Sequence, residues 1–256
     1  MINKNRIIPI LLLKDGGLYK TFQFKDPKYI GDPINTINIF NEKKVDELIV
    51  LDISREAKNK GPNFELLADI ANEAFFPIAY GGGIENLEQA TRIMELGFYK
   101  LSFCSAIYQN PLLVEKCVKT FGAQSVVGCL DVKVNSSGEI SIYINNGNDK
   151  INWKIEKYIS FIKQLNIGEL ILNDIQKDGT FDGYNFDLLI EVNKKIQIPM
   201  VASGGAKSYA DIASLFSKVN ISAAAGALFV YYGPYNAVLI SYPSQEEKLK
   251  ILNAKQ

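Results

Sequence analysis

The sequence predicts a (β/α)8 TIM barrel of the α/β class, built from two repeated half-barrels, and two observations favour this fold. Short apolar, β-branched runs alternate with amphipathic stretches of about 10–13 residues, which is the pattern of parallel βα units. The chain also repeats itself, because residues 47–67 (ELIVLDISREAKNKGPNFELL) and 169–189 (ELILNDIQKDGTFDGYNFDLL) are identical at ten of 21 positions. An offset of 122 residues is too long for a solenoid repeat and describes half of a closed domain.

The predicted elements alternate along the whole chain. Strands are expected near residues 6–13, 47–52, 76–80, 99–104, 124–131, 169–173, 198–203 and 220–225. Helices are expected near residues 33–44, 63–73, 86–96, 110–119, 153–165, 185–195, 208–217 and 244–253. We expect one domain over 1–256, with halves of approximately 1–122 and 123–256, because such halves bury their strands fully only by closing on each other. A doubly wound open sheet is the alternative, although it rarely contains two equal halves in tandem.

Composition excludes several classes of function. The 28 basic and 28 acidic residues balance, so the chain has no electrostatic footprint for nucleic acid or for an anionic membrane. No apolar run approaches the ~20 residues of a membrane span. The chain has no histidine, which excludes a Ser-His-Asp triad and the usual zinc sites. We therefore expect no metal and no cofactor, with proton transfer left to carboxylates, lysines, tyrosines or cysteines.

The cysteines and the amino terminus indicate a cytoplasmic protein. Cys104, Cys117 and Cys129 are odd in number and have no metal-ligand spacing, so buried free thiols in a reducing compartment are expected. The apolar run 7–13 follows two basic residues, as in a signal peptide. It is short, contains Pro9 and ends without a small-residue cleavage site, so it is interpreted as the first strand.

Two connections are longer than βα units need. Residues 15–32 follow the first strand, and residues 134–149 follow the fifth and include a 139–144 stretch that alternates like a small hairpin. Both are expected on the C-terminal face of the barrel, where barrel enzymes carry out their chemistry. Long ordered connections of this kind act as lids or binding loops, or only decorate the fold.

Two glycine turns end the third and seventh strands at repeat-related positions. They are Gly81-Gly82-Gly83-Ile84 and Ser203-Gly204-Gly205-Ala206. Glycine lets backbone N–H groups converge on an anion at a helix start, whereas a tight turn without a ligand explains either one alone. The pair favours a phosphorylated small-molecule ligand with a phosphate at each end. Further candidate phosphate-binding residues are Cys104 and Ser105 at the first turn, and Asp178, Gly179, Gly226 and Ala227 at the second.

Charged residues begin four of the predicted strands, so they gather at the end of the barrel opposite the expected active face. They are Arg6, Glu47, Lys100 and Glu169. One interpretation is a purely structural ring of salt bridges that closes the barrel. The other is a gate through which a small molecule passes.

The two halves differ at one position that matters for chemistry. Asp131 ends the fifth strand and points to the active face, but the equivalent residue of the first strand is Leu12. Leucine cannot transfer a proton, and the loss of an acid or base typically costs ~10²–10⁴ in rate, or roughly 3–5 kcal/mol of barrier. Asp131 alone either acts in catalysis or caps a loop.

With these features the chain resembles the cyclase subunit of imidazole glycerol phosphate synthase, the HisF family, over nearly its whole length. The motifs that carry the resemblance are Arg6-Ile7-Ile8-Pro9, Lys14-Asp15-Gly16, Gly31-Asp32-Pro33, Leu51-Asp52-Ile53, Asp178-Gly179-Thr180, Gly226-Ala227-Leu228-Phe229 and the two glycine turns. The resemblance implies that a HisH-like glutaminase docks on the bottom of the barrel. Ammonia then passes a gate of Arg6, Glu47, Lys100 and Glu169 to a bis-phosphorylated ligand, over which the Lys20 loop closes.

The chain also departs from the family pattern. The resemblance implies two catalytic aspartates, of which only Asp131 is present, while Cys104 and Ala227 replace a usual Asn and Ser. The tyrosine-rich segment 231–243 replaces the usual short helix and resembles paralogues associated with acetamidino modification of surface-polysaccharide sugars. Those paralogues imply a separate sugar amidotransferase as a second partner.

Three functions are therefore weighed. The first is an ammonia-conducting barrel for sugar amidination in lipopolysaccharide or O-antigen biosynthesis. The second is a lyase/cyclase of histidine biosynthesis in which Asp131 works alone. The third is a non-catalytic phosphosugar-binding scaffold.

Overall fold

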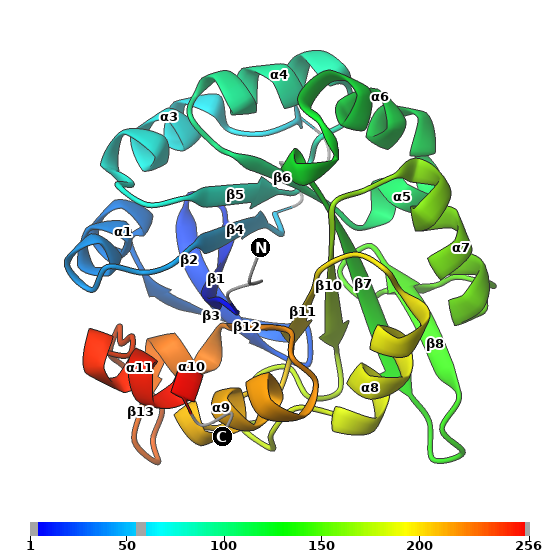
Figure 1. The fold of residues 1–256 in the computed structure, drawn as a ribbon. Coiled ribbons are helices and arrows are strands. Elements are labelled where there is room, and N and C mark those ends of the chain that lie inside the picture. The colour runs from blue at the N-terminus through cyan, green and yellow to red at the C-terminus, as the bar shows by residue number, and fades with distance from the viewer. Residues whose placement is uncertain (1–4, 55–59, 254–256) are drawn as a thin grey trace.

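A closed barrel of eight parallel strands forms the centre of the computed structural model, which describes residues 5–54 and 60–253 (Figure 1). Each strand pairs in parallel with the next, and pairing of β1 with β12 closes the ring, which confirms the predicted (β/α)8 barrel. The barrel strands are β1 (Ile7–Lys14), β4 (Leu48–Asp52), β5 (Ile78–Gly81), β6 (Lys100–Phe103), β7 (Val126–Val134), β10 (Glu169–Asp174), β11 (Met200–Ser203) and β12 (Ser222–Ala225).

Helices surround this barrel as an outer layer (Figure 1). They are α1 (Pro33–Glu42), α3 (Phe64–Glu73), α4 (Leu87–Glu95), α6 (Pro111–Phe121), α7 (Ile155–Leu165), α8 (Phe186–Lys195), α9 (Tyr209–Lys218) and α11 (Gln245–Asn253). Five of them begin at a polar side chain that accepts a hydrogen bond from a backbone N–H of the first turn, which satisfies a donor that the helix leaves open: Asp32, Asn63, Asn86, Asn185 and Ser208. The predicted helix bounds hold to within two residues and the strand bounds to within three.

The two copies of the sequence repeat build the same local structure. Asn63 caps α3 and Asn185 caps α8 through the same hydrogen bond to a backbone N–H three residues on. Gly82 and Gly204 have φ values of +114° and +93°. A Cβ there would lie 2.2 Å from the carbonyl oxygen of the aspartate that ends β4, and 2.5 Å from that of the aspartate that ends β10. Both glycine turns therefore exclude a side chain for the same steric reason.

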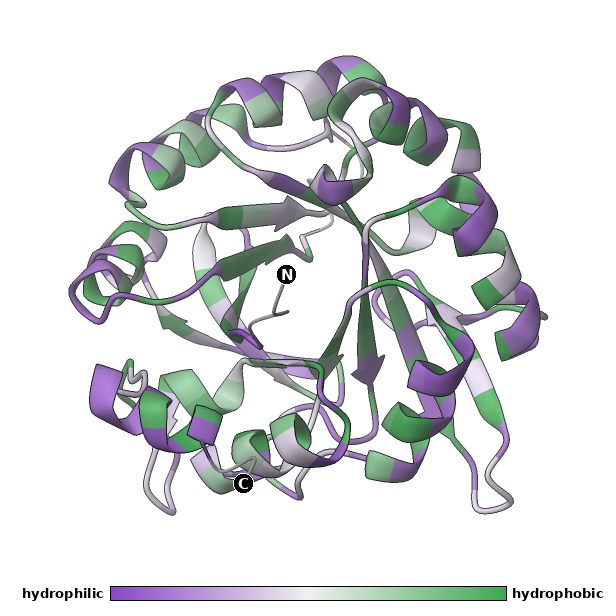
Figure 2. Cartoon of the chain, in the orientation of Figure 1, coloured by the Kyte–Doolittle hydropathy of each residue, from purple (hydrophilic) through white to green (hydrophobic). Residues whose placement is uncertain are grey.

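Apolar side chains pack in two separate layers, one inside the barrel and one between the barrel strands and the surrounding helices. Alternate residues of each strand point to opposite faces, so Ile8 and Ile10 of β1 lie inside the barrel, while Leu11 and Leu13 pack under the helices. The interior cluster also contains Ile49, Ala79, Val127, Cys129, Ile171, Val201 and Ala224. Figure 2 shows the barrel strands as mainly hydrophobic, with hydrophilic residues concentrated on the helices and loops.

The two long connections form hairpins that extend barrel strands. Residues 15–32 contain β2 (Gly17–Phe22), which pairs antiparallel with β1, and β3 (Lys25–Gly31). The hairpin expected near 139–144 is β8 (Ile140–Ile144), which pairs with β7 and with β9 (Asp149–Lys150). In the β2–β3 hairpin, the turn is formed by Gln23 and Phe24, both of which have positive φ values. Because neither residue is glycine, the sequence of this first hairpin carries no strong turn signal.

Three short helices were not predicted: α5 (Ser105–Gln109), α10 (Ala227–Val230) and the 3-10 turn η1 (Ala123–Ser125). The expectation that a tyrosine-rich segment replaces the short helix after the last strand was wrong. Helix α10 is present, and the segment follows it as a hairpin of β13 (Tyr231–Tyr232) and β14 (Ala237–Val238). In the described part of the chain, no helix is long and apolar enough to cross a membrane. All three cysteines are free, and Cys104 is only partly buried.

The glycine turns make a testable prediction about stability. Gly82→Ala introduces a Cβ against backbone, whereas Gly97→Ala is a matched control because its φ of +109° is similar and nothing lies within 4 Å of the added atom. The control carries the backbone strain alone, so we expect Gly82→Ala to cost ~1–3 kcal/mol more in free energy of unfolding. Urea unfolding of both variants measures the difference, and equal costs would contradict the steric account.

Candidate functional site

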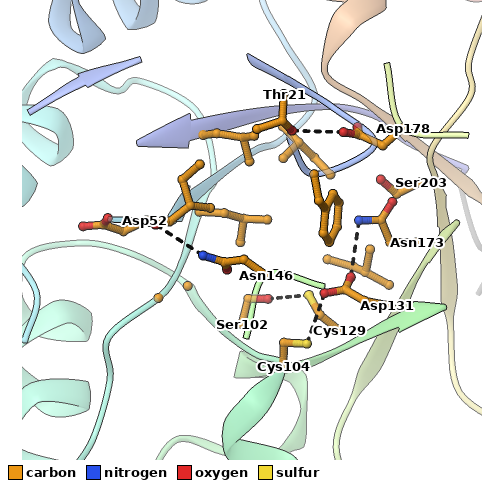
Figure 3. A pocket seen from close by; sticks show the side chains of 18 of the residues that line it. Thr21, Asp52, Ser102, Cys104, Cys129, Asp131, Asn146, Asn173, Asp178 and Ser203 are labelled. Atoms are coloured by element: carbon orange, nitrogen blue, oxygen red, sulfur yellow. Dashed lines mark hydrogen bonds between the residues drawn. The ribbon is translucent and has the colours of Figure 1, made fainter. Parts of the chain in front are cut away.

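A cavity of about 1280 Å³ opens at the carboxyl ends of the barrel strands (Figure 3). The structure brings every residue predicted for catalysis or phosphate binding to its wall: Leu12, Lys20, Gly82, Gly83, Cys104, Ser105, Asp131, Asp178, Gly179, Gly204, Gly205, Gly226 and Ala227. The strand order explains this convergence, because the loops that follow parallel strands of a closed barrel meet at one face.

Asp131 is the buried carboxylate of this cavity. The Cys104 thiol donates to its Oδ2 at 3.3 Å, and Asn173 Nδ2 donates to its Oδ1 at 3.3 Å. Burial raises the pKa of Asp131 to about 6, although both hydrogen bonds favour the ionised form. Burial and the neighbouring Asp131 charge keep the pKa of the Cys104 thiol well above its ordinary value, so the thiol stays a donor. A carboxyl group that titrates near neutral pH is suited to proton transfer.

Leu12 faces this cavity from the opposite side of the barrel. The strands β1 and β7 lie four positions apart in the eight-stranded ring, and Leu12 pairs with Leu51 of β4. Its apolar side chain packs against the interior cluster, as does Leu51. Asp131 therefore has no carboxylate partner on β1.

Asp52 is a residue of this cavity that the sequence analysis did not assign a role. It ends β4 and accepts hydrogen bonds from the Ser54 N–H at 2.9 Å and the Ser54 hydroxyl at 2.6 Å. Burial raises its pKa, although the Ser54 hydrogen bonds oppose the change. The signal was present in the repeat, because Asp52 and Asp174 are identical in both copies.

The glycine turns offer unused backbone donors. Within residues 5–54 and 60–253, the N–H groups of Gly82, Gly83, Gly204 and Gly205 have no protein acceptor. Successive N–H groups of this kind form a concave anion site. At the first turn, the Ser105 hydroxyl accepts a hydrogen bond from the backbone of the β8–β9 hairpin at 3.0 Å.

The β2–β3 hairpin is held across the mouth of the cavity by the loop after β10. The buried Lys20 Nζ lies 2.8 Å from Asp178 Oδ1, and the Thr21 hydroxyl donates to Asp178 Oδ2 at 3.0 Å (Figure 3). Asp178 was expected to offer a backbone donor to phosphate. Instead its N–H donates to the Asp174 carbonyl at 3.1 Å, because it lies inside a tight turn, and its carboxylate holds the hairpin.

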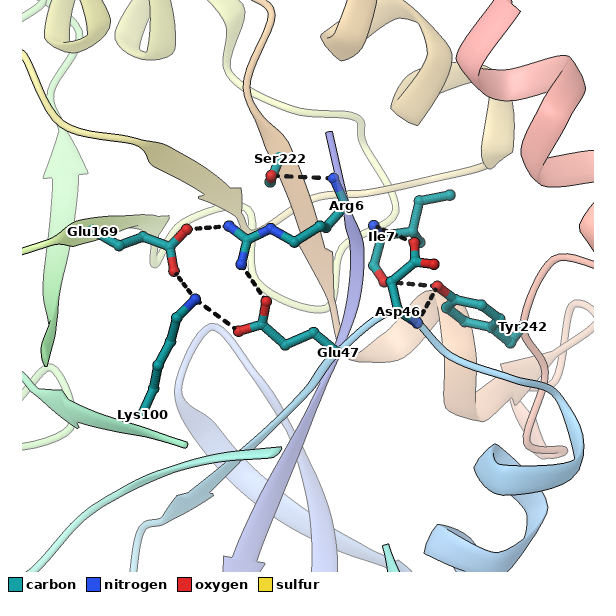
Figure 4. Close-up of polar contacts among 8 residues, drawn as sticks. All are labelled: Arg6, Ile7, Asp46, Glu47, Lys100, Glu169, Ser222 and Tyr242. Carbon is teal, nitrogen blue, oxygen red and sulfur yellow. Dashed lines mark hydrogen bonds and ion pairs between the residues drawn. The ribbon is translucent and has the colours of Figure 1, made fainter. Parts of the chain in front are cut away.

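A ring of ion pairs closes the amino-terminal end of the barrel (Figure 4). Arg6 donates to Glu47 and to Glu169. Lys100 Nζ completes the ring, at 3.2 Å from Glu47 and 2.7 Å from Glu169. Burial disfavours the Arg6 charge, yet the carboxylates of Glu169 and Glu47 raise its pKa. The structure thus brings the four predicted residues together in alternating sign.

An apolar interior separates this ring from the cavity. The interior cluster of isoleucine, valine and alanine side chains lies between the strand starts, which carry the ring, and the strand ends, which carry Asp131. Transfer of an ion into such a layer is costly, because the ion loses its hydration and finds no partner there. Along the barrel axis the structure therefore has a charged ring, an apolar interior and a buried carboxylate.

Comparisons with known proteins identify the family of the chain. The family model described as "Histidine biosynthesis protein" matches residues 6–236. The chain belongs to this family. It is 45% identical over 241 residues to the Pseudomonas aeruginosa protein named "Putative imidazole glycerol phosphate synthase subunit hisF2", covering 94% of this chain and 96% of the relative. It is 32% identical to the Alkaliphilus metalliredigens "Imidazole glycerol phosphate synthase subunit HisF", covering 91% and 92%.

A further relative of this histidine biosynthesis family supports the same assignment. The Vibrio vulnificus "Putative imidazole glycerol phosphate synthase subunit hisF3" is 41% identical over 251 residues, which cover 97% of this chain and 96% of the relative. The resemblance to HisF inferred from the motifs is confirmed. These matches extend over barrel and cavity together, so family membership concerns the whole fold.

The buried carboxylate makes a prediction about stability and pH. The folded-state pKa of Asp131 is about 6, above the unfolded value of about 3.9, so ionisation opposes folding as pH rises between these values. Asp131→Asn removes this opposition. Relative to the wild type, we expect the free energy of unfolding of this variant to increase by ~2 kcal/mol between pH 4 and pH 7, or roughly 5 °C in Tm.

Thermal unfolding of both proteins from pH 4 to pH 8 measures this effect. The pH 4 arm is the reference, because Asp131 is then protonated in the folded chain and only about half ionised in the unfolded chain, so the loss of the side-chain contacts dominates the difference there. A stability difference that does not change with pH would show that Asp131 is not desolvated.

Proposed function

We propose that this chain is the synthase subunit of a glutamine-dependent enzyme of the imidazole glycerol phosphate synthase type. A glutaminase partner docks at the end that carries the ion-pair ring, and ammonia passes through the barrel to a phosphorylated ligand in the cavity. The observation that supports this most directly is the succession of closed charged ring, apolar interior and Asp131 site along one axis. The free thiols suit a reducing compartment, so we place the enzyme in the cytoplasm.

The ring acts as the entrance gate in this proposal. An ammonium ion would be excluded from the apolar interior by the cost of desolvation, so the transported species is neutral ammonia. Movement of Lys100 breaks two of the four ion pairs and opens the ring while Arg6 keeps both carboxylates paired.

Chemistry at the upper end uses the lone pair of ammonia and the carboxylate of Asp131. Ammonia adds to a carbonyl carbon of the ligand, the π electrons of the C=O bond pass to its oxygen, and Asp131 accepts a proton from the nitrogen and returns it to that oxygen. The glycine turns at Gly82-Gly83 and Gly204-Gly205 hold the phosphate groups at the two ends of the ligand. The first candidate reaction is therefore the lyase/cyclase reaction of histidine biosynthesis, in line with the names of the relatives.

A second candidate is favoured by Leu12. The apolar side chain opposite Asp131 removes one of two groups that the resemblance to cyclases implies, whereas delivery of ammonia needs only the gate and the interior. In this candidate the barrel supplies ammonia for the amidination of a sugar in lipopolysaccharide biosynthesis, with a separate sugar amidotransferase as a further partner. The two candidates share the conduit and differ in the nitrogen acceptor.

The docking of a glutaminase gives the first test. Phe75 is 84% exposed in the α3–β5 connection, at the same end as the ring. Asn41 holds this loop, accepting from the Phe75 N–H at 2.9 Å and donating to the Glu73 carbonyl at 2.6 Å. A rigidly held exposed aromatic is a typical interface anchor. We expect Phe75→Ser to weaken glutaminase binding at least ~10-fold, equivalent to ~1.4 kcal/mol.

Calorimetry with the cognate glutaminase measures this affinity. Leu112→Ser is the control, because Leu112 is 66% exposed but lies in the first turn of α6, at the opposite end of the barrel. If Phe75→Ser and Leu112→Ser bind alike, the interface lies elsewhere. If the wild type fails to bind the glutaminase at micromolar concentration, the conduit proposal is wrong.

The nitrogen acceptor is tested with the bis-phosphorylated cyclase substrate and an ammonium salt, for the natural chain and for Leu12→Asp. Turnover by the natural chain identifies a histidine-pathway enzyme. Turnover only after Leu12→Asp, with a gain of ~10²-fold or more, identifies a cavity that still binds this substrate but lacks one proton-transfer group. Absence of turnover by both proteins would exclude the cyclase reaction and leave sugar amidination or a non-catalytic phosphosugar-binding scaffold.

A further inference from the structure

A second cavity of about 390 Å³ adjoins the main one. It lies between the β13–β14 hairpin, helix α10 and the connection from β11 to α9. We call this second cavity the tyrosine groove. Its wall contains Lys207, Tyr209, Tyr231 and Tyr232. Phe181 and Leu228 line both this groove and the main cavity, so the two spaces share a wall.

The groove begins where the second glycine turn ends. Lys207 follows Gly204-Gly205 by two residues, and Leu228 follows Gly226-Ala227 directly. A phosphate held at this turn is therefore next to the groove. A terminal phosphomonoester would leave the groove empty, whereas a phosphodiester would direct its second substituent into it.

The side chains of the groove indicate which substituent of a phosphodiester it would bind. Tyrosine faces bind planar rings by stacking, which is tolerant of the identity of the base. Tyr232 is 69% exposed, so its ring is available to a ligand without rearrangement of the core. Lys207 is exposed and forms no ion pair with any residue in the described ranges, so its ammonium is available to a phosphate oxygen.

The shared wall carries a second unusual feature. Phe181 has a φ of +59°, a conformation that bulky side chains rarely adopt. Residues held in such conformations cluster at ligand sites, where the surrounding structure enforces them. Here the conformation holds an aromatic side chain at the junction of the main cavity and the groove.

We propose that the tyrosine groove binds the nucleoside part of a nucleoside diphosphate, whose phosphates occupy the second glycine turn. The ring of the base stacks on Tyr232, and Lys207 pairs with the diphosphate. This rests on the proposed function, because it takes the phosphate site at Gly204-Gly205 as its starting point. The ligand of this barrel is then a nucleotide or a nucleotide-linked compound, in which the second glycine turn holds an internal diphosphate and not a terminal phosphate, as the second candidate function allows.

Calorimetry compares UDP and ADP with inorganic pyrophosphate on the full chain. We expect both nucleotides to bind at least ~10-fold more tightly than pyrophosphate, because stacking acts on any base. Tyr232→Ser is expected to reduce nucleotide affinity to the pyrophosphate level and leave pyrophosphate binding unchanged. Tyr235→Ser is the control, since Tyr235 is 94% exposed on the same hairpin but does not line the groove.

Lys207→Gln gives a second variant that leaves the hairpin untouched and is expected to weaken binding of all three ligands. Equal affinity of nucleotides and pyrophosphate for the wild type would overturn the groove proposal but keep the phosphate site. Equal losses in Tyr232→Ser and Tyr235→Ser would also overturn it, by assigning the effect to the hairpin. If none of the three ligands binds, both the groove and the phosphate site fail, while the glutaminase measurement still tests the conduit separately.

Discussion

The ion-pair ring of Arg6, Glu47, Lys100 and Glu169 is the interaction on which the rest of the molecule depends. Each carboxylate is shared by two cations, and each cation by two carboxylates. Buried charges are tolerated only when they are paired in this way, because a single unpaired charge costs several kcal/mol. The ring therefore ties the starts of four strands together and closes the barrel interior at one end.

Closure of the barrel by the ion-pair ring influences the protonation of Asp131 at the opposite end. Within residues 5–54 and 60–253, the interior cluster between the ring and Asp131 consists of apolar side chains, so that carboxyl group lies in a poorly solvated environment. Desolvation then outweighs the hydrogen bonds from Cys104 and Asn173 and brings the pKa of Asp131 to about 6. The β2–β3 hairpin, which the Lys20–Asp178 ion pair holds in place, lies across the opening of the cavity. The apolar interior and the raised pKa of Asp131 thus both follow from the closure of the barrel at the ring.

The internal repeat explains what the two halves share and where they diverge. Backbone features are common to both copies: the asparagine caps of α3 and α8 and the glycine turns packed against an aspartate carbonyl. Side chains at the cavity differ, since Leu12 stands opposite Asp131, and the tyrosine groove adjoins only the second turn. A symmetric scaffold therefore presents an asymmetric site, which suits a ligand whose two ends differ.

The sequence by itself determined the barrel, the order of its elements, the glycine turns and the identity of the ring. Those features depend on local periodicity and on position within a strand, since residues at the start or end of parallel strands must meet at one end of a barrel. The first hairpin and helix α10 were not predicted because their sequence signals are weak. Only the tertiary structure decided which groups touch. The partners of Asp131 are 27 and 42 residues away, and Lys20 meets Asp178 across 158 residues. Burial, and the pKa that follows from it, depends on all elements packed around a group.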